Sequence, residues 1–265
     1  MLGCLCFALL LCTISVPATA ESHSEPPLVA LASSFRTLWP ELMQAYRSET
    51  GEIEPRTSFA SSGLLTTQIR HGAPFELYLS ADQSTVQQLA TLGKTHDAGV
   101  TLATGAISLV WRTATQTPAQ ANVGKALPQS GLQVMIGKLE KSEPFKLTIP
   151  NPRHAPYGIA AKQALDSAGL WPLPAGYLLS AENAAQTLQF ALTGAVDYAL
   201  VPDTLVMQLP PELQKMPLEP GSYEPVIHQM VLLNPARTGA QTLYEWLQGE
   251  SAASILSRYG LTPIS

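Results

Sequence analysis

Cysteine is scarce in this 265-residue chain, and none occurs after residue 12. Cys4, Cys6 and Cys12 all lie in an apolar N-terminal segment that we expect to be removed. A mature chain without cysteine excludes disulfides, thiol catalysis and cysteine-ligated zinc. The fold must therefore rest on its hydrophobic core, for which a hydrophobic content of 46% is sufficient.

Positive charge is also sparse. The chain has 15 Lys and Arg against 20 Asp and Glu, a formal net charge of −5, and the basic residues form no run. Nucleic-acid-binding domains usually concentrate basic residues on one face. We therefore do not expect nucleic acid as a partner.

Familiar catalytic motifs are missing as well. The sequence has no nucleophile elbow, phosphate-binding loop, dinucleotide fingerprint or H-E-x-x-H pair. The five histidines are far apart in sequence, and we interpret each as exposed or hydrogen-bonded rather than as a metal ligand. These are His23, His71, His96, His154 and His228. We expect no enzyme and no cofactor; a hydrolase that uses Ser62 with a distant His and Asp is the minor alternative.

The first 20 residues are typical of a secretory signal peptide. They carry no charged side chain, and an apolar stretch around Phe7 to Leu11 is followed by an A-x-A ending at Ala18 to Ala20. The stretch is too short to span a membrane as a helix. We predict cleavage after about Ala20 and a free periplasmic protein. A lipid anchor on Cys12 is the alternative, although Leu11 stands where a small residue would be expected.

From Leu28 onward, short apolar runs alternate with helix-like stretches, which predicts a mostly parallel α/β sheet followed by a second α/β unit of similar size. In the first unit the expected elements are Leu28 to Ala32, Phe35 to Ser48, Phe75 to Ser80 and Ser84 to Leu92. In the second, the apolar runs are Ile107 to Trp111, Leu132 to Ile136, Tyr177 to Leu179 and Val196 to Val201, and the helices are Gly158 to Ala168 and Ala184 to Leu192.

The last part of the chain holds an apolar strand, Val226 to Leu233, and two helical segments. If these complete the first unit, the chain crosses between the units twice, near Gly105 and Gly221. This division gives lobe 1 as residues 28–104 plus 222–265 and lobe 2 as residues 105–221. Two lobes joined by two segments would form a hinged clamp with a ligand site between them.

Four short polar or small-residue stretches each precede a predicted helix. They are Ala32-Ser33-Ser34-Phe35, Phe59-Ala60-Ser61-Ser62-Gly63, Ala155-Pro156-Tyr157-Gly158 and Ser180-Ala181-Glu182-Asn183-Ala184. A helix N-terminus has free N–H groups and a partial positive charge, so it can hold an anion without a cationic side chain. For each stretch alone, helix capping is the simpler interpretation. Several such ends in one cleft could hold a dianion.

Around these stretches the sequence follows a longer pattern. It includes the run from Ser58 to Asp82, then Asn151-Pro152 and Ala155 to Gly158, and finally Arg258-Tyr259-Gly260. Over nearly all of the mature chain this pattern resembles the periplasmic molybdate-binding proteins of ABC transporters. The resemblance implies a type II periplasmic binding protein fold, with two α/β lobes, mixed sheets and a two-segment hinge. It also implies that molybdate or tungstate is bound by uncharged groups and delivered to an ABC transporter permease.

The resemblance also assigns the site. It implies that Ser34, with Ser33 beside it, and Ser62, with Ser61 beside it, bind the anion. Tyr157 and Ala184 would contribute at least backbone N–H groups. Val201 stands where some members have a tyrosine whose hydroxyl contacts the anion. We therefore expect the Tyr157 hydroxyl to take the place of that donor.

Other ligands and functions remain as alternatives. Sulfate is smaller than molybdate and should fit the same cleft poorly, while phosphate carries a proton that calls for a carboxylate acceptor. Glu182 is the only acid in the four stretches, and we interpret it as a favourable charge at a helix start. A regulator of the same fold would need a DNA-binding module. We expect a monomer, because closure of a hinge requires free lobes.

Overall fold

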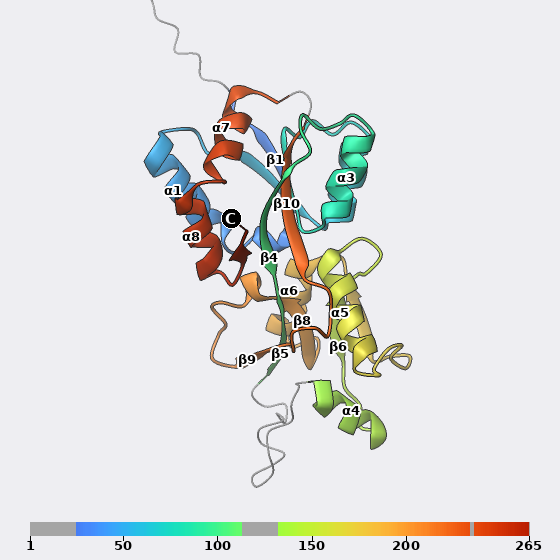
Figure 1. The fold of residues 1–265 in the computed structure, drawn as a ribbon. Helices are drawn as coiled ribbons and strands as arrows, with labels where there is room; N and C mark the ends of the chain where they lie inside the picture. The colour runs from blue at the N-terminus through green and yellow to red at the C-terminus, as the bar shows by residue number, and fades with distance from the viewer. Residues whose placement is uncertain (1–24, 113–131, 234–235, 265) are drawn as a thin grey trace, which may run out of the picture.

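A computed structural model of the chain describes residues 25–112, 132–233 and 236–264. The predicted signal peptide, its cleavage site and the three cysteines lie outside these ranges. The described residues form two α/β lobes, which lie one above the other in Figure 1. Within these ranges, no helix has both the length and the apolar character needed to cross a membrane.

The first lobe is built on a six-stranded mixed sheet. In spatial order its strands are β11 (Thr262–Pro263), β4 (Val100–Gly105), β10 (Val226–Leu232), β3 (Leu77–Ser80), β1 (Leu28–Ala32) and β2 (Arg56–Ala60). β1 is parallel to both β2 and β3, but β10 is antiparallel to its neighbours β3 and β4. The mixed sheet that the resemblance implies is therefore confirmed, whereas the mostly parallel arrangement suggested by the alternating pattern alone is wrong, because a strand from the end of the chain inserts in the opposite direction.

Helices cover both faces of this sheet. On one face lie α1 (Trp39–Thr50), α7 (Thr238–Trp246) and α8 (Glu250–Arg258), and on the other lie α2 (Ser62–Arg70) and α3 (Gln83–Thr91) (Figure 1). Successive side chains of a strand point to opposite faces. Accordingly, Val29 and Leu31 of β1 join the apolar cluster with α1 and α8, whereas Ala30 joins the cluster with α2 and α3.

The second lobe has a five-stranded mixed sheet. Its strands, in spatial order, are β7 (Leu178–Ala181), β6 (Leu147–Pro150), β8 (Tyr198–Pro202), β5 (Ile107–Arg112) and β9 (Leu213–Pro217). Its helices are α4 (Leu132–Glu140), α5 (Pro156–Ser167) and α6 (Ala184–Thr193). In β8 the side chains alternate, since Tyr198 and Leu200 pack in the cluster that includes α5, and Ala199 and Val201 pack in the cluster that includes α6.

Two local predictions differ from the structure. The apolar run Leu132 to Ile136 belongs to helix α4, in which Leu132 and Met135 are buried and Gln133 is exposed. That three-residue spacing is helical rather than alternating. The helix expected from Phe35 instead divides into a short 3₁₀ turn, η1 (Ser33–Phe35), and α1, which begins at Trp39 with Pro40 in its first turn.

The chain passes between the two sheets twice. β4 of the first sheet ends at Gly105 and β5 of the second begins at Ile107, while the return path lies between β9 and β10. The two connections are joined directly, because the Ile107 N–H donates a hydrogen bond to the Tyr223 hydroxyl at 3.0 Å. β4 includes Gly105, which pairs with Val226, so the first sheet extends one residue beyond the boundary expected at residue 104.

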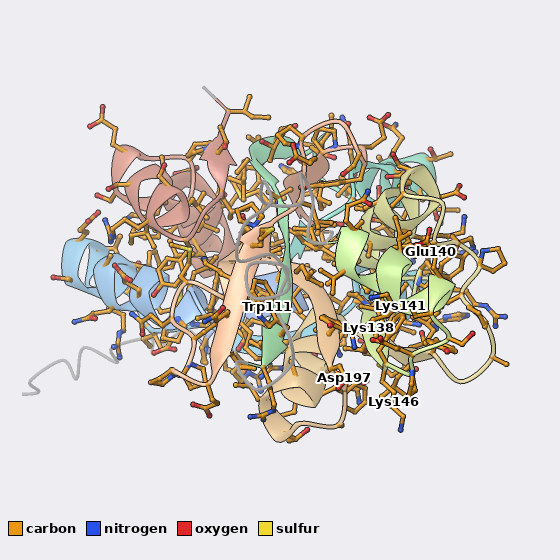
Figure 2. All side chains as sticks on the ribbon, turned by 90° about the horizontal axis from the view of Figure 1, so that it is seen from below. Trp111, Lys138, Glu140, Lys141, Lys146 and Asp197 are labelled. Carbon is orange, nitrogen blue, oxygen red and sulfur yellow. The ribbon has the colours of Figure 1, made fainter. Side chains whose placement is uncertain are left out.

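The far end of the second lobe carries charges of both signs. Figure 2 shows Lys138 and Glu140 of α4, and Lys141 in the turn after it, on the same side of the molecule as Lys146 and Asp197. Lys138 lies 3.5 Å from Glu143, and the Lys146 N–H donates to the Asp197 carboxylate at 2.8 Å. Lysines here lie among acids rather than forming a uniformly basic surface.

Candidate functional site

A small cavity of about 10 Å³ lies between the two lobes. Its first-lobe lining follows the carboxyl ends of β1, β2 and β3, which is the edge where open α/β sheets bind ligands. The six residues predicted as anion ligands all line it: Ser33, Ser34, Ser61, Ser62, Tyr157 and Ala184. The other lining residues are Ala32, Ala81, Ala155 and Pro156. The structure thus brings the predicted residues together, and their role as ligands stays a prediction.

Three α-helices begin at the cavity. α2 starts at Ser62 in the first lobe, and α5 and α6 start at Pro156 and Ala184 in the second. The first N–H groups of a helix have no partner within it, and the helix dipole places partial positive charge there. The cavity is therefore electropositive, although none of the described residues that line it is charged.

The serine hydroxyls of the first two stretches do not cap their helices. Neither η1 nor α2 has a side-chain cap hydrogen bond, and the same holds for α5. In contrast, α6 is capped by Asn183, whose side chain accepts from the Gln186 N–H at 3.1 Å. Capping thus accounts for the polar residue of the fourth stretch but not for the serines of the first two.

Two of these serines instead accept hydrogen bonds from backbone N–H groups. The Ser62 hydroxyl oxygen accepts from the Ala81 N–H at 3.0 Å, and the Ser33 hydroxyl oxygen accepts from the Ala184 N–H at 3.1 Å. A hydroxyl that accepts in this way still has its own proton to donate. Both hydroxyls therefore still have a proton that a ligand in the cavity could accept. The second bond also engages the Ala184 N–H, which the resemblance assigns to the anion.

The Tyr157 side chain is buried at the cavity and lies over Gly105. A Cβ added to Gly105 would lie only 2.1 Å from the Tyr157 hydroxyl oxygen, so only glycine leaves room for that oxygen. Burial raises the pKa of Tyr157 well above its ordinary value, with a further contribution from Asp203. The hydroxyl consequently keeps its proton at neutral pH and can donate it.

Val201 packs away from the cavity. It is fully buried in an apolar cluster with Ala184 and Ala199, and it is not among the cavity's lining residues. At this position the chain has a core side chain that offers no donor. Tyr157, in contrast, is among the lining residues and carries a phenolic hydroxyl.

Sequence reasoning assigned no site role to His228, yet it lies beside two predicted ligand residues. It is fully buried in β10, and its Nε2 is 3.4 Å from both the Ser34 Oγ and the Tyr157 hydroxyl oxygen. Burial lowers the pKa of His228 to about 4, so the imidazole is neutral at pH 7. No local motif could identify it, because 194 residues separate it from Ser34.

His154 is a second histidine without a predicted role, and it joins the lobes. Its Nδ1 lies 2.7 Å from the Ser61 Oγ, and its carbonyl accepts from the Gly63 N–H at 2.9 Å. The Glu182 carboxylate is 3.8 Å from its Nε2. His154 thus holds the start of α2 against the second lobe. Elsewhere in the described residues, no group of three or more His, Cys, Asp or Glu side chains gathers as a metal site would require.

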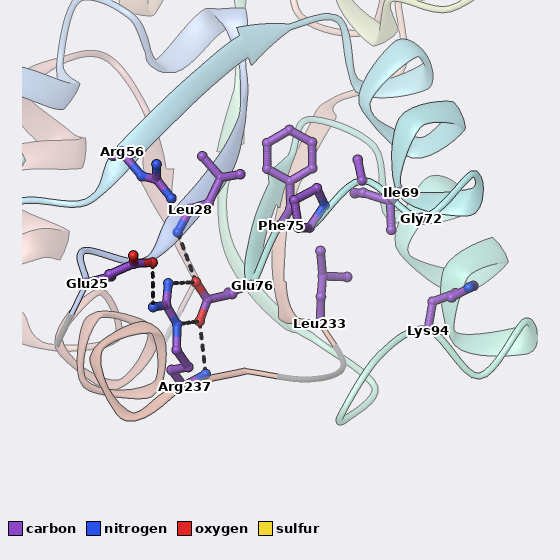
Figure 3. A pocket seen from close by; sticks show the side chains of 12 residues that line it. Glu25, Leu28, Arg56, Ile69, Gly72, Phe75, Glu76, Lys94, Leu233 and Arg237 are labelled. Atoms are coloured by element: carbon purple, nitrogen blue, oxygen red, sulfur yellow. Dashed lines mark hydrogen bonds and ion pairs between the residues drawn. The ribbon is translucent and has the colours of Figure 1, made fainter.

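A larger cavity of about 460 Å³ lies at the opposite end of the first sheet (Figure 3). Its buried carboxylate, Glu76, accepts hydrogen bonds from the Leu28 N–H at 3.1 Å and from the Arg237 N–H, Nε and Nη2 at 3.0, 2.8 and 2.5 Å. Burial alone would raise the pKa of Glu76, but these hydrogen bonds outweigh it and lower the pKa. Because the carboxylate is already saturated, we interpret this pair as a structural clamp between β1, β3 and the start of α7.

Comparison with known proteins identifies relatives along most of the chain. The family model described as bacterial extracellular solute-binding protein matches residues 27–262. The molybdate-binding protein ModA of Azotobacter vinelandii is 32% identical over 247 residues, which cover 88% of each chain.

Solved structures share the fold. The periplasmic molybdate-binding protein of Azotobacter vinelandii has a TM-score of 0.74 at 23% identity and covers 90% of this chain and 100% of its own. The sulfate-binding protein SubI of Mycobacterium tuberculosis has a TM-score of 0.69 at 13% identity and covers 91% and 87%. At these identities the structural likeness shows the two-lobed fold alone.

Proposed function

Because the chain belongs to the bacterial extracellular solute-binding proteins, we propose that it captures molybdate or tungstate between its lobes and delivers it to an ABC importer. The chemistry of the interlobe cavity carries this proposal. The cavity offers hydroxyls whose oxygens already accept hydrogen bonds, together with the starts of three helices, and it has no charged side chain among its described lining residues. Such a site suits an anion that only accepts hydrogen bonds.

Uncharged donors also suit a protein that must release its cargo. A buried Lys or Arg would be left without its counter-charge when the anion leaves, at a cost of several kcal/mol. Hydroxyl and N–H groups carry no such penalty. Each hydrogen bond to a charged acceptor contributes roughly 1.5–3 kcal/mol, so the hydroxyls of Ser33, Ser34, Ser62 and Tyr157 together could support tight binding.

The lobes would act as a clamp. We take residues 28–104 plus 222–265 and residues 105–221 as the moving parts, with the two connections beside Ile107 and Tyr223 as the hinge. Contacts between the lobes support this view, because Ser33 bonds to Ala184 and Ser61 contacts His154. An anion that bonds to both lobes would stabilise the closed arrangement in the same way.

The N-terminal sequence supports a proposal for where the protein acts. We propose that the segment up to about Ala20 is removed during export and that the mature protein acts in the periplasm as a monomer without a cofactor. A lipid anchor at Cys12 stays the alternative, and one relative, YvgL of Bacillus subtilis, is named as a putative substrate-binding lipoprotein. Mass spectrometry of the exported protein would distinguish a chain that begins at Glu21 from one lipidated at Cys12.

Two other functions are less well supported. Sulfate binding rests on the shared fold with SubI, and sulfate is too small to reach donors on both lobes as well as molybdate does. A hydrolase would need a base beside Ser62. The described hydroxyl of Ser62 instead accepts from the Ala81 N–H and has no hydrogen bond to a histidine.

Isothermal titration of residues 21–265 with molybdate, tungstate, sulfate and phosphate tests the proposal. We expect one-to-one binding of molybdate and tungstate, with sulfate and phosphate at least about 100-fold weaker, a difference of roughly 2.7 kcal/mol. Absence of binding by both molybdate and tungstate would overturn it, and tight binding of sulfate would replace it with the sulfate alternative.

A further inference from the structure

The buried side chain of His228 contacts hydroxyls of both lobes. Its Nε2 faces one hydroxyl from each lobe, Ser34 from the first and Tyr157 from the second, at 3.4 Å from both. The imidazole is held by packing, because the Phe35 ring meets it edge-on at 5.2 Å and the Tyr157 ring is 5.8 Å away. The position of Nε2 relative to the two hydroxyls is therefore fixed.

The ring nitrogen of His228 that carries the proton decides whether the histidine donates to Ser34 and Tyr157 or accepts from one of them. A neutral imidazole has a single N–H, either on Nε2 or on Nδ1. With the proton on Nε2, the histidine donates to both hydroxyl oxygens, and a donor shared between two acceptors makes two long bonds. The protons of Ser34 and Tyr157 then point elsewhere. With Nε2 bare, one hydroxyl would donate to the histidine and would be lost to the cavity as a donor.

The other two hydroxyls of the site favour the first arrangement. Ser62 and Ser33 each accept from a backbone N–H, a group that can only donate. In both cases the protein supplies a donor to the oxygen and leaves the hydroxyl proton for the cavity. An Nε2–H on His228 would do the same for Ser34 and Tyr157.

We propose that His228 is a positioning residue that donates from Nε2 to the hydroxyl oxygens of Ser34 and Tyr157, turns their protons towards the bound anion and so selects a fully deprotonated tetrahedral dianion over a protonated one. This inference rests on the proposed function, since it assigns the selectivity of the same site. Hydrogen phosphate carries a proton that needs an acceptor. A cavity whose hydroxyl oxygens are already engaged by protein donors leaves that proton unsatisfied, and a site rejects a ligand strongly when a buried polar group stays unpaired.

Two variants of His228 test the role in the mature protein. In His228→Leu the side chain cannot donate, so the two hydroxyls can rotate and accept. We expect molybdate to bind at least about tenfold more weakly than to the wild type and the ratio of molybdate to phosphate affinity to fall by a similar factor. His228→Gln can donate from its amide, and we expect it to restore part of the loss. His96→Leu, at an exposed histidine of the same lobe, serves as the control.

The tautomer provides a readout that does not depend on a variant folding. Long-range ¹H–¹⁵N correlation spectra of the ¹⁵N-labelled wild type at pH 7 should place the His228 proton on Nε2, both without and with molybdate. A proton on Nδ1 would overturn the inference. It would also be overturned if His228→Leu folded and kept the molybdate affinity and the phosphate discrimination of the wild type.

Failure of the proposed function would look different. In that case the wild-type protein itself would bind neither molybdate nor tungstate, and the inference would fall with it. If the wild type binds molybdate and only the His228 expectations fail, the anion-binding function stands and His228 is a packing residue.

Discussion

The hydroxyl oxygen of Ser33 in one lobe accepts a hydrogen bond from the backbone N–H of Ala184 in the other, at 3.1 Å. Both residues line the interlobe cavity, and both are buried. The bond makes the same serine part of the contact between the lobes and a donor towards the cavity. Loss of its hydroxyl should therefore affect closure and anion binding together.

We expect Ser33→Ala to weaken molybdate binding about tenfold, equivalent to roughly 1.4 kcal/mol, because one hydroxyl donor is lost and the Ala184 N–H loses its protein partner. Isothermal titration measures the effect. Thr193→Ala, at an exposed position on the same helix as Ala184, is the control and should bind as the wild type does. Tighter binding by Ser33→Ala would show instead that the anion and Ser33 compete for the Ala184 N–H.

Gly105→Ala should displace the Tyr157 hydroxyl. The added Cβ would lie 2.1 Å from that oxygen and 2.8 Å from Cε1 of His228, so the side chains must move. We expect molybdate affinity to fall at least about tenfold. In a Tyr157→Phe variant the hydroxyl is absent and the main clash disappears. Adding Gly105→Ala to that variant should therefore reduce molybdate affinity clearly less than it does in the wild type.

The control for this pair is Gly137→Ala, because a Cβ at Gly137 in α4 meets no atom within 4 Å. Equal losses from Gly105→Ala with and without the Tyr157 hydroxyl would contradict the packing argument. The loss would then arise from the backbone at the crossing.

Gly63→Ala should hinder closure of the lobes. A Cβ there would lie 2.8 Å from the His154 carbonyl oxygen, which belongs to the other lobe and accepts the Gly63 N–H. With saturating molybdate, small-angle scattering should give a larger radius of gyration than for the wild type, and titration should give weaker binding. Gly239→Ala, whose Cβ would make only an ordinary contact with Pro27, should change neither quantity. An unchanged radius of gyration in Gly63→Ala would show that this contact does not limit closure.

His228 should make the stability of the protein depend on pH. Its pKa is about 4 in the folded state and 6.5 ordinarily, so between these values the unfolded chain binds the proton and the folded chain does not. The free energy of unfolding therefore falls as the pH falls from 6.5 to 4. His228 alone should lower it by roughly 3 kcal/mol over this range. Urea unfolding at pH 7 and pH 4.5 should show a smaller loss for His228→Gln than for the wild type. His96→Gln should follow the wild type, and parallel losses in all three proteins would contradict the prediction.

The Glu76 and Arg237 pair should matter for stability and not for binding. Glu76 precedes β3, whereas the cavity lies at the far end of that strand, beside Ala81. We expect Glu76→Gln to lower the thermal unfolding temperature at pH 7, since Arg237 loses its ion pair. The difference from wild type should shrink as the pH falls through the lowered pKa of Glu76. Molybdate affinity should be unchanged, and a marked loss of affinity would show that this end of the sheet is coupled to the site.

The residues that line the interlobe cavity could be picked out from the sequence because they lie in short local stretches, while their role as ligands stays a prediction. Two of the four stretches follow neighbouring parallel strands of the first sheet and two follow neighbouring parallel strands of the second, so strand order brings each pair to one edge of its own sheet. The packing of the two lobes then brings these edges together. A helix start needs only one capping residue, yet two serines, Ser61 and Ser62, occur together before the second predicted helix. This excess of hydroxyl residues drew attention to the site.

The contacts of His228 and His154 could not be predicted, because they depend on how distant segments meet. His228 reaches Ser34 and Tyr157 only because β10 inserts between β3 and β4, and a single sequence does not encode that order in any local pattern. The direction of β10 was missed for the same reason. Within the second lobe, the run from Leu132 to Ile136 was not recognised as part of a helix, because five residues, four of them apolar, are too few to separate a helix from a strand by periodicity.

The order of strands in the two sheets also bears on how the chain folds as it emerges. All five strands of the second sheet lie between Ile107 and Pro217, in one continuous segment, whereas the first sheet needs β10 between β3 and β4. A chain that appears from its N-terminus therefore holds a complete second sheet before Val226 exists. Until then β3 and β4 have no common neighbour, and their free edges can pair with other chains. The N-terminal lobe is in this sense the last to be finished, and its exposed edges are where a chaperone would need to act.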